Sequence, residues 1–541
     1  MPETKQLNFT PENTALAGQI LREGGLVAIP TETVYGLAAN AFNGEACARI
    51  FAAKGRPSDN PLIVHIASLD QWSALVAEVP EAAVRLAEAF WPGPLSIILP
   101  KSDKIPDQVS GGLDTVAVRM PSHPAAAAVI RAAGVPLAAP SANLSGSPSP
   151  TTAHHVLRDL QGRIDAVLDG GACEVGVEST VISLAGQTPR VLRPGGISVE
   201  QLRAVLGEVE VDEAVLHQLA PGQQAVSPGM KYKHYSPKTR VIIVKGSFAA
   251  FQKFVSNKKD CAALCFACEG EQLDIPFIEV GREHDSLSQA HRLFDALRRV
   301  DELGVSVAYA RCPDTDGVGL AVLNRLLRAA AFTLVDLNGA AVIGLTGPTG
   351  AGKSTVADIL QKKHAFAWID ADQTARGVTE KGSPLLPVLA EHFGADILDE
   401  TGALIRSKLA QRAFASPEKT ALLNQLTHPA VTERIFAEVD RLSAAGTKAV
   451  LIDAAALFES GIDKLCSFTA VVTASELVRL RRIMARDKID EQSARLRMKA
   501  QLSAEDYEKN ADVIVRNEPP FDVETEAEKI FERYKELTEN E

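Results

Sequence analysis

One stretch decides the fold of the last part of this chain: Ala341-Val-Ile-Gly-Leu-Thr-Gly347-Pro-Thr-Gly-Ala-Gly352-Lys353-Ser354. Residues 341–345 have strand character, and residues 355–362, which follow the glycine-rich loop, have helical periodicity. A loop of this spacing between a strand and a helix is a P-loop, whose backbone N–H groups surround phosphates at a helix N-terminus. Lys353 is expected to reach the β- and γ-phosphates, and Ser354 to hold magnesium. We therefore predict a nucleotide-binding α/β domain with a parallel sheet.

Carboxylates follow two later strand-like runs. Residues 366–369 lead into Asp370-Ala-Asp372, and residues 449–452 lead into Asp453. Carboxylates at the end of a parallel strand can face the nucleotide and accept a hydroxyl proton. Taken alone, the first pair also fits a solvated turn, and Asp453 also fits a capping residue.

A basic stretch, residues 479–486, places Arg479, Arg482 and Arg486 on one face of a predicted helix. Arginines so placed can hold a transferring phosphoryl group from a lid, although a solvated helix face has the same pattern.

Together these features resemble the dephospho-coenzyme A kinase family across residues 342–517. The matching motifs are Ile343-Gly-Leu-Thr-Gly347, Ile369-Asp-Ala-Asp372 with Ala375-Arg376, Phe393-Gly394 with Ile397-Leu398, His428-Pro429, Leu457-Phe-Glu459-Ser-Gly461, Arg497 with Gln501, and Ala511-Asp512. Two departures are Pro348-Thr349, where Gly-Ile is usual, and Ala455-Ala456, where Pro-Leu is usual.

The resemblance implies a role for each matching residue. Asp372 would be the base on the ribose 3′-hydroxyl, with Lys353 and Arg486 also catalytic and Arg376 on a phosphate. Ser354 and Asp453 would hold Mg²⁺. ATP would lie on Gly347, Thr349, Gly350, Ala351, Gly352, Lys353 and Ser354.

The first part of the chain alternates apolar strand-like runs with alanine-rich helical segments, which predicts a mixed α/β domain. Polar clusters adjoin its strands: Pro30-Thr-Glu-Thr33-Val-Tyr35-Gly36, Lys54-Gly-Arg56-Pro-Ser-Asp-Asn60-Pro61, His65, Thr115-Val-Ala-Val-Arg119, Pro140-Ser141-Ala-Asn143, Val177-Glu-Ser179-Thr180 and Arg193-Pro-Gly195. Four cations could neutralise a triphosphate without a P-loop, although each alone fits a surface charge, and His65 alone fits a core histidine.

These clusters resemble the YrdC-like family of L-threonylcarbamoyl-AMP synthases from Gly24 to Gly196. The resemblance continues through a lid motif at residues 227–237 and through Asn324-Arg325-Leu326, both typical of the two-domain branch. That family joins L-threonine, bicarbonate and ATP into threonylcarbamoyl-adenylate and releases pyrophosphate. A partner transferase then modifies tRNA.

The resemblance also assigns residues to this site, with Lys54 and Arg56 as catalytic cations. Threonine would be held by Thr33, His65, Arg119 and Ser179. ATP would be held by Lys54, Arg56, Asn60, Thr115, Ser141, Asn143, Arg193 and Tyr235. Mg²⁺ is expected to bridge the phosphates.

We expect four segments. They are a YrdC-like twisted α/β domain (residues 1–215), a linker or lid (216–238), a small Rossmann-like α/β domain (239–336) and a P-loop kinase domain (340–541). The length of 541 residues fits several domains.

Composition and charge limit the class of protein, its binding partners and its cellular compartment. Hydrophobic residues make up 46% of the chain, as in an ordinary globular protein, and the net charge of −12 argues against strong nucleic-acid binding. The 7 cysteines, including Cys261, Cys265 and Cys268, suit a reducing compartment better than a disulfide framework or metal site. Without a predicted signal peptide or membrane span, we expect a cytoplasmic protein.

Other functions fit parts of the pattern. The first part could be a non-catalytic RNA-binding module or perform a carbamoyl-adenylate step in a maturation enzyme. The last part could be a nucleoside monophosphate kinase or a nucleotide sensor. The favoured reading is a fusion of two ATP-using enzymes, with a functional link to the tRNA threonylcarbamoyl transferase complex.

Overall fold

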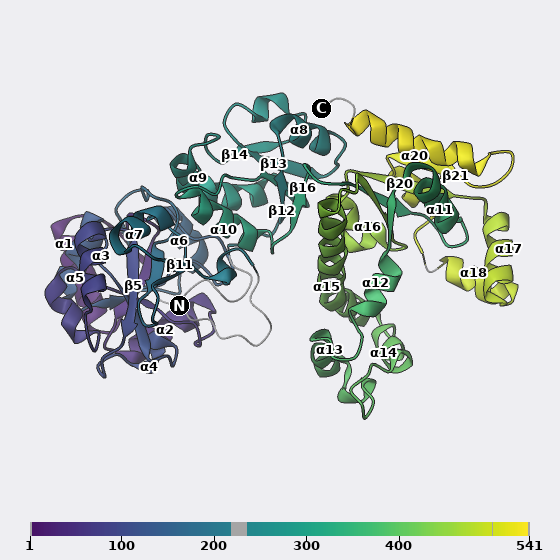
Figure 1. The fold of residues 1–541 in the computed structure, drawn as a ribbon. Coiled ribbons are helices and arrows are strands. Elements are labelled where there is room, and N and C mark those ends of the chain that lie inside the picture. The colour runs from purple at the N-terminus through teal and green to yellow at the C-terminus, as the bar shows by residue number, and fades with distance from the viewer. Residues whose placement is uncertain (1–2, 218–234, 500, 539–541) are drawn as a thin grey trace. The chain divides into compact units, whose positions relative to one another are not determined.

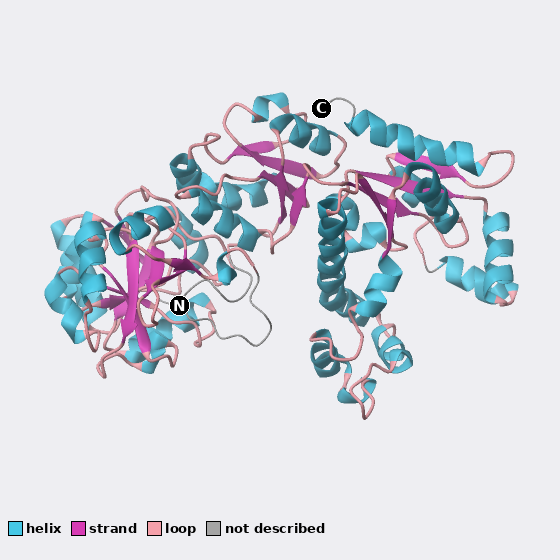
Figure 2. Ribbon diagram, in the orientation of Figure 1, coloured by secondary structure: helices cyan, strands magenta, loops and turns pink. Residues whose placement is uncertain are grey.

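The computed structural model describes residues 3–217, 235–499 and 501–538 (Figure 1). The predicted lid motif therefore lies outside the described residues up to its last three, Tyr235, Ser236 and Pro237. The chain divides into two compact units, Met1–Phe248 with Lys259–Val335, and Ala249–Lys258 with Asp336–Glu541. Helices and strands alternate in both units, which confirms the predicted α/β class (Figure 2).

The first unit contains an 11-stranded mixed sheet of order β1-β8-β2-β3-β7-β4-β6-β5-β9-β10-β11. The sheet contains both parallel pairs, such as β4–β6, and antiparallel pairs, such as β5–β6. The strands are β1 Lys5–Asn8, β2 Val27–Ile29, β3 Gly36–Asn40, β4 Ile63–His65, β5 Leu95–Pro100, β6 Thr115–Arg119, β7 Leu137–Ala138, β8 Ala166–Asp169, β9 Thr180–Ser183, β10 Arg190–Arg193 and β11 Glu210–Val211.

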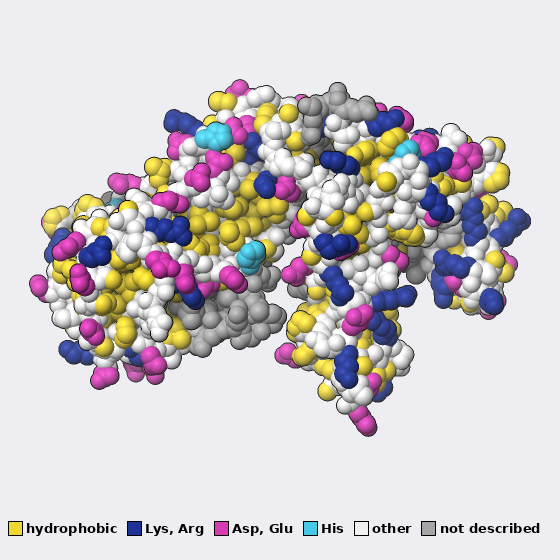
Figure 3. Space-filling model, in the orientation of Figure 1, with side chains coloured by type: hydrophobic (Ala, Val, Ile, Leu, Met, Phe, Trp, Pro, Cys, Tyr) yellow, Lys and Arg dark blue, Asp and Glu magenta, His cyan; other side chains and the backbone are white. Residues whose placement is uncertain are grey.

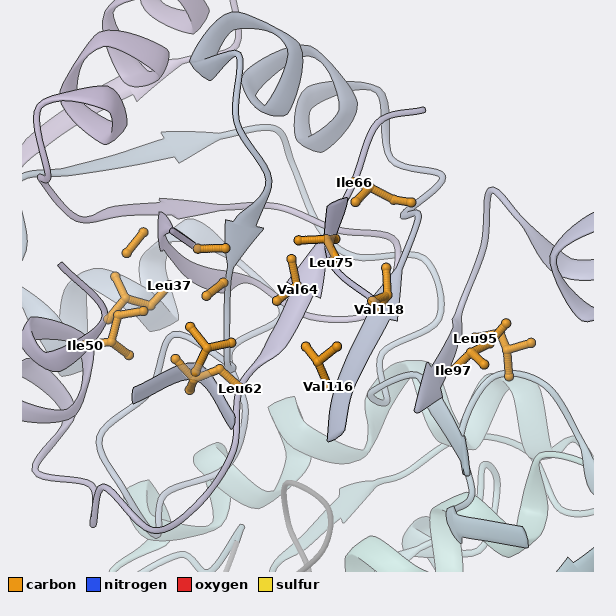
Figure 4. Packing of buried hydrophobic residues seen from close by; sticks show 14 of the residues in the cluster. Leu37, Ile50, Leu62, Val64, Ile66, Leu75, Leu95, Ile97, Val116 and Val118 are labelled. Carbon is orange, nitrogen blue, oxygen red and sulfur yellow. The ribbon is translucent and has the colours of Figure 1, made fainter. Parts of the chain in front are cut away.

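Apolar side chains cover both faces of this sheet because successive residues of a strand point to opposite sides. Leu37 and Ala39 of β3 join the largest buried cluster, whereas Ala38 joins a second cluster. Figure 4 shows part of the largest cluster, with Val64 and Val118 among its labelled side chains. The helices of this part are α1 Pro11–Arg22, α2 Gly44–Lys54, α3 Glu81–Phe90, α4 Asp107–Ser110, α5 Pro124–Ala133, α6 Ala153–Leu160 and α7 Val199–Leu206.

A second, 5-stranded sheet has the order β14-β13-β15-β12-β16, and we call it the small sheet. Its pairs β12–β15, β13–β15 and β13–β14 are parallel, as expected for a Rossmann-like unit. The strands are β12 Arg240–Lys245, β13 Cys261–Cys265, β14 Phe277–Glu279, β15 Val307–Arg311 and β16 Leu334–Asp336; the helices are α9 Ser286–Arg299 and α10 Gly319–Ala329. The helix that follows β12, α8 Phe248–Ser256, belongs to the second unit from Ala249 on.

The second unit is built on a 5-stranded sheet of order β18-β19-β17-β20-β21, in which every neighbouring pair is parallel. The strands are β17 Ala341–Thr346, β18 Ala367–Asp370, β19 Ala449–Asp453, β20 Phe468–Thr473 and β21 Val513–Arg516. The parallel sheet predicted from the P-loop is thus confirmed.

Helices cover both faces of this sheet. Leu451 of β19 packs in one cluster with residues of α11 and α20, and Ile452 packs in another with residues of α15. No helix among the described residues has both the length and the apolar character needed to cross a bilayer. The helices are α11 Lys353–His364, α12 Ala371–Gly377, α13 Leu385–Phe393, α14 Arg406–Ala413, α15 Pro417–Ala444, α16 Leu457–Ser460, α17 Glu476–Asp487, α18 Glu491–Lys499, α19 Ala504–Lys509 and α20 Val523–Thr538.

Candidate functional sites in the two units

The first unit contains a pocket, which we call the first-unit pocket. It collects residues from β3, β4, β6 and β10 and from the segments that adjoin β7 and β9, although these strands are far apart in sequence. Its lining residues are Thr31, Thr33, Val34, Gly36, Arg56, Ile63, His65, Arg119, Ala139, Pro140, Ser141, Glu178, Ser179, Arg193 and Tyr235. All four residues that were predicted to bind the substrate threonine therefore line one pocket. Four of the residues predicted to bind ATP, Arg56, Ser141, Arg193 and Tyr235, line it as well.

Arg119 is held in this pocket by a buried ion pair. Its Nη2 lies 2.7 Å from Oε1 of Glu32, and the two side chains are 4% and 5% exposed. Its Nη1 donates to the Thr33 hydroxyl at 3.0 Å, and Thr33 in turn lies 2.8 Å from the Thr31 hydroxyl. A guanidinium fixed beside small hydroxyls is suited to bind the carboxylate of a hydroxylated amino acid.

Arg193 and Ser179 form another part of the lining. Arg193 Nη2 donates to the Ser179 carbonyl at 2.9 Å and to its hydroxyl at 3.1 Å, and Ser96 Oγ lies 2.8 Å from Ser179 Oγ. Burial lowers the pKa of both Arg193 and Arg56 to about 10, so both remain charged at neutral pH. The Nε of Arg56 has no hydrogen-bond partner among the described residues. Two buried guanidiniums give the pocket the charge needed to hold phosphates.

Lys54 lies behind the lining rather than in it. It is the last residue of α2, and Gly55 then ends the helix with φ 62°, a left-handed conformation that favours glycine. Its ammonium donates to the carbonyls of Ser141 and Asn143, at 2.5 and 2.6 Å, and to Asn143 Oδ1 at 3.3 Å. Burial and Arg56 hold the pKa of Lys54 well below its usual value. Lys54 thus stabilises the loop that contains Ser141 and Asn143.

Asn60 and Thr115 also lie outside the pocket lining. The Asn60 carbonyl accepts from Arg56 Nη2 at 3.4 Å, so Asn60 contacts the pocket through Arg56. Thr115 begins β6, whereas Arg119 ends it, so the two side chains lie at opposite ends of one strand. The ATP roles of Lys54, Asn60, Asn143 and Thr115 remain predictions.

His65 ends β4 and is almost fully buried in the pocket wall. Its Nδ1 lies 3.2 Å from the Ile63 carbonyl. Burial, followed by the charge of Arg119, lowers the pKa of His65 to about 3. The imidazole is therefore neutral at physiological pH and can act as a hydrogen-bonding wall residue but not as a cation.

We expect the first unit to lose stability as the pH falls because of His65. Its folded pKa lies below the unfolded value, so its stabilising contribution is complete above pH 6.5 and is lost as the pH falls toward 3. The loss is about 1.4 kcal/mol for each pH unit below 6.5. Urea unfolding of the chain and of a His65→Gln variant at pH 7 and pH 5.5 measures this.

In that experiment, both proteins carry Trp368→Phe, so that only Trp72 and Trp91 of the first unit report unfolding by fluorescence. Between pH 7 and pH 5.5, the free energy of unfolding of the His65→Gln variant is expected to fall by about 1 kcal/mol less than that of the parent. Equal losses in the two proteins would show that His65 is not the group that titrates.

The P-loop of the second unit joins β17 to α11 as predicted. Gly347 has φ 141°, and a Cβ there would lie 2.1 Å from the Val472 carbonyl oxygen. Gly352 has φ 93°, and a Cβ there would lie 2.1 Å from Asn517 Nδ2. Lys353 Nζ donates to the Gly347 carbonyl at 3.2 Å across the loop. The loop therefore needs glycine at both positions and has its lysine folded over it.

Carboxylates gather beside this lysine at the carboxyl edge of the sheet. Asp370 and Asp453 are register partners at the ends of β18 and β19. Asp370 caps α12 by accepting from the Gln373 amide at 3.0 Å, a capping role that the sequence had suggested only for Asp453. Asp372 lies in the first turn of α12. The predicted carboxylates therefore meet the P-loop at one edge.

The charges at this edge perturb each other. Burial raises the pKa of Asp453 to about 6; Lys353 lowers it, and Asp370 and Asp372 raise it further. The pKa of Asp372 is also raised, by burial and by Asp370, against the lowering effect of Lys353 and Arg376. A carboxylate of raised pKa near the P-loop lysine is suited to accept a proton.

The arginines of α17 differ in what they bind. Arg482 donates to the carbonyls of Gly350, Ala351 and Asn517 at 3.3, 3.1 and 2.8 Å, so it clamps the P-loop. Arg486 is paired with the neighbouring Asp487 at 2.8 Å and is exposed. Basic side chains gather on the surface over α17 and α18 (Figure 3). The phosphate-binding roles of Arg376 and Arg486 stay predictions.

Several residues of these sites were not predicted as functional. Glu32 and Glu178 line or pair within the first-unit pocket, and Asn517 donates to the Ala351 carbonyl at 2.8 Å. Gln501 accepts from the P-loop amide of Thr349 at 2.8 Å. Glu32 and Glu178 stand inside quoted motifs, so their position was a usable signal, whereas Asn517 follows a strand and belongs to no local motif.

Comparison with known proteins gives different matches for the two parts of the chain. Family models described as "Telomere recombination", "Threonylcarbamoyl-AMP synthase, C-terminal domain" and "Dephospho-CoA kinase" match residues 19–195, 197–331 and 341–522. A threonylcarbamoyl-AMP synthase of Pyrococcus abyssi is 47% identical over 329 residues, which are 60% of this chain and 95% of the relative. A dephospho-CoA kinase of Corynebacterium efficiens is 43% identical over 180 residues, which are 33% of this chain and 90% of the relative.

A solved structure resembles the first part. It is that of P. abyssi Sua5 complexed with L-threonine, with 43% identity and a TM-score of 0.58, covering 62% of this chain and 99% of that one. Sequence and fold thus agree for this part.

Proposed function

The chain belongs to the threonylcarbamoyl-AMP synthase family through its first part and to the dephospho-CoA kinase family through its last part, and we propose that it catalyses both reactions at separate sites. The resemblance to a fusion of two enzymes is thereby confirmed. The observation that carries the proposal is that each unit contains its own set of phosphate-binding groups. These are Arg56 and Arg193 in the first unit and the P-loop in the second.

In the first reaction, L-threonine, bicarbonate and ATP give L-threonylcarbamoyladenylate, pyrophosphate and water. The threonine amine bonds to the bicarbonate carbon, and the bicarbonate hydroxide leaves with an amine proton as water, which gives the threonine carbamate. Arg119 holds the threonine carboxylate, and Thr33 and Ser179 contact its polar groups. Support comes from the fixed geometry of Arg119 and from the L-threonine in the related structure. An oxygen of the threonine carbamate forms a bond to the α-phosphorus of ATP, and the bond from that phosphorus to the pyrophosphate oxygen breaks. The carbamate is itself the nucleophile, so the pocket only positions groups and neutralises charge.

In the second reaction, ATP phosphorylates the ribose 3′-hydroxyl of dephospho-CoA. Asp372 accepts the hydroxyl proton, the 3′-oxygen bonds to the γ-phosphorus, and ADP leaves as the bond to the β-phosphate oxygen breaks. Lys353 and the P-loop amides hold the phosphates during transfer. The raised pKa of Asp372 supports its role as base.

Mg²⁺ fits the second site through Ser354 and Asp453. The Asp453 carboxylate, in register with Leu345 at the end of β17, supplies a hard oxygen ligand. Mg²⁺ keeps most of its ligands from water and phosphate, so one or two protein oxygens are enough to hold it. When bound, Mg²⁺ neutralises developing charge on the phosphates.

This proposal also places the protein in the cytoplasm, where ATP and tRNA are found. It links the adenylate product to a tRNA threonylcarbamoyl transferase complex, which must consume it. The names of the relatives favour these two reactions over an RNA-binding module, a nucleoside monophosphate kinase or a nucleotide sensor.

The test uses the purified full chain with ATP and Mg²⁺. Pyrophosphate release is expected only when L-threonine and bicarbonate are both present, and ADP release only with dephospho-CoA. AMP and CMP serve as rival acceptors for the second site. Pyrophosphate without ADP would leave only the first function, and ADP with AMP as acceptor would replace the second by a nucleotide kinase.

A further inference from the structure

Arg325 of α10 is fully buried and extends from the small sheet's side into the wall of the first-unit pocket. Its Nε donates to Glu178 Oε2 at 2.9 Å, and its Nη1 donates to the Pro194 carbonyl at 2.7 Å. Nη1 also donates to Asn324 Oδ1 at 2.9 Å, which fixes the guanidinium from its own helix. One side chain of α10 is therefore hydrogen-bonded to two separate segments of the pocket wall.

Both gripped segments carry predicted substrate residues. Glu178 lines the pocket and immediately precedes Ser179, and Pro194 immediately follows Arg193. Ser179 and Arg193 are hydrogen-bonded to each other, so displacement of either segment disturbs both. Glu178 is further held by the Ser149 hydroxyl at 2.6 Å.

Tyr235 completes this arrangement. The Arg325 Cζ lies 5.8 Å from the centre of the Tyr235 ring, within the range of a cation–π contact. Tyr235 lines the pocket and also packs on Phe294 of α9, with ring centres 5.2 Å apart. The groups around Arg325 thus join the threonine end of the pocket to the predicted ATP residues.

We propose that Arg325 is a positioning residue for the synthase reaction, through which the small-sheet domain sets the geometry of Ser179 and Arg193 in the first-unit pocket. The proposal rests on the function proposed above. The forked guanidinium is needed because its donors at Nε and Nη1 must reach a carboxylate and a carbonyl on different segments at the same time. A lysine offers one point charge and can replace only one of these contacts.

A second buried ion pair offers a control that distinguishes a positioning role of Arg325 from a purely structural one. Arg298 of α9 donates to Asp159 of α6 at 3.0 and 2.8 Å and to the Pro148 carbonyl at 2.5 Å. Like Arg325, it is buried and connects a helix that follows the small sheet's first strands to the part of the unit that contains the pocket, but neither Asp159 nor Pro148 lines the pocket. Arg298→Lys is therefore a matched control for Arg325→Lys.

The experiment compares the full chain with these two variants by steady-state kinetics of threonine-dependent pyrophosphate release and by thermal unfolding. Arg325→Lys is expected to lower kcat/KM for L-threonine and for ATP by about tenfold or more, with part of the loss in kcat. Arg298→Lys is expected to lower kcat/KM for L-threonine and for ATP by no more than about twofold. Its Tm is expected to change by about as much as that of Arg325→Lys. Equal kinetic losses in the two variants would overturn the proposal.

A further variant covers the case in which the fold is damaged. Arg325→Met combined with Glu178→Gln removes both charges and is expected to recover the Tm that Arg325→Met alone loses, but not the kcat/KM. Recovery of both would show that Arg325 has only a structural role. If the unsubstituted chain released no pyrophosphate, the proposed function would fail. ATP titration calorimetry would then test Arg325 alone: weaker binding is expected in Arg325→Lys and not in Arg298→Lys, and equal affinities would overturn the proposal.

Discussion

Replacing Lys353 by alanine is expected to reduce dephospho-CoA phosphorylation by about three orders of magnitude while threonine-dependent pyrophosphate release stays within about twofold of the unsubstituted chain. Lys353 is the cation of the P-loop and balances the charges of Asp372 and Asp453. Its loss removes the group that neutralises the transferring phosphoryl group. The arginines predicted to bind phosphate in the first-unit pocket belong to the other unit, so we expect them to be unaffected by the loss of Lys353.

The measurement is a pair of assays on one preparation: ADP release with dephospho-CoA, and pyrophosphate release with L-threonine and bicarbonate. Lys362→Ala is the matched control, because Lys362 lies on the same helix, is 73% exposed and, among the residues that the structure describes, pairs only with Asp358 at the surface. It is expected to leave both rates unchanged. A parallel fall of both activities in Lys353→Ala would contradict the reading of two independent sites.

The second site could largely be predicted from sequence because its geometry is local or set by strand order. The P-loop is one continuous stretch, and carboxylates that end neighbouring parallel strands must meet at one edge of the sheet. Asp370 and Asp453 therefore came together as the pattern implied. The sequence did not distinguish their roles, since capping by Asp370 depends on where α12 begins.

The first site was harder to predict because its contacts join distant residues without a spacing rule. The motifs named Arg119 and Arg193, yet nothing local pairs Arg119 with Glu32 or directs Arg325 to Glu178. Lys54 shows the opposite difficulty. Its residue type suggested a phosphate ligand, but its ammonium is already bound by two carbonyls and an amide oxygen. Such buried hydrogen bonds depend on the tertiary fold rather than on residue type.

Replacing Arg119 by glutamine is expected to reduce kcat/KM for L-threonine by about two to three orders of magnitude. The guanidinium is the one predicted partner of the threonine carboxylate, and its position is fixed by Glu32, Thr33 and the Gly93 carbonyl. Glutamine keeps a donor but loses the charge, so the carboxylate would enter a buried pocket beside Glu32 without compensation. Most of the loss is expected in the KM for threonine, because ATP is held by other groups.

Stability must be separated from binding here, because Arg119→Gln also leaves Glu32 as a buried charge and is expected to cost about 3 kcal/mol of folding free energy. A double variant, Arg119→Gln with Glu32→Gln, removes that charge and is expected to recover most of the stability while threonine binding stays weak. Arg49→Gln is the control, since the Arg49–Asp165 pair lies in the same unit but is exposed at 52% and 33%. If the double variant regained the threonine KM of the parent, Arg119 would be a structural residue, and another group would have to hold the carboxylate.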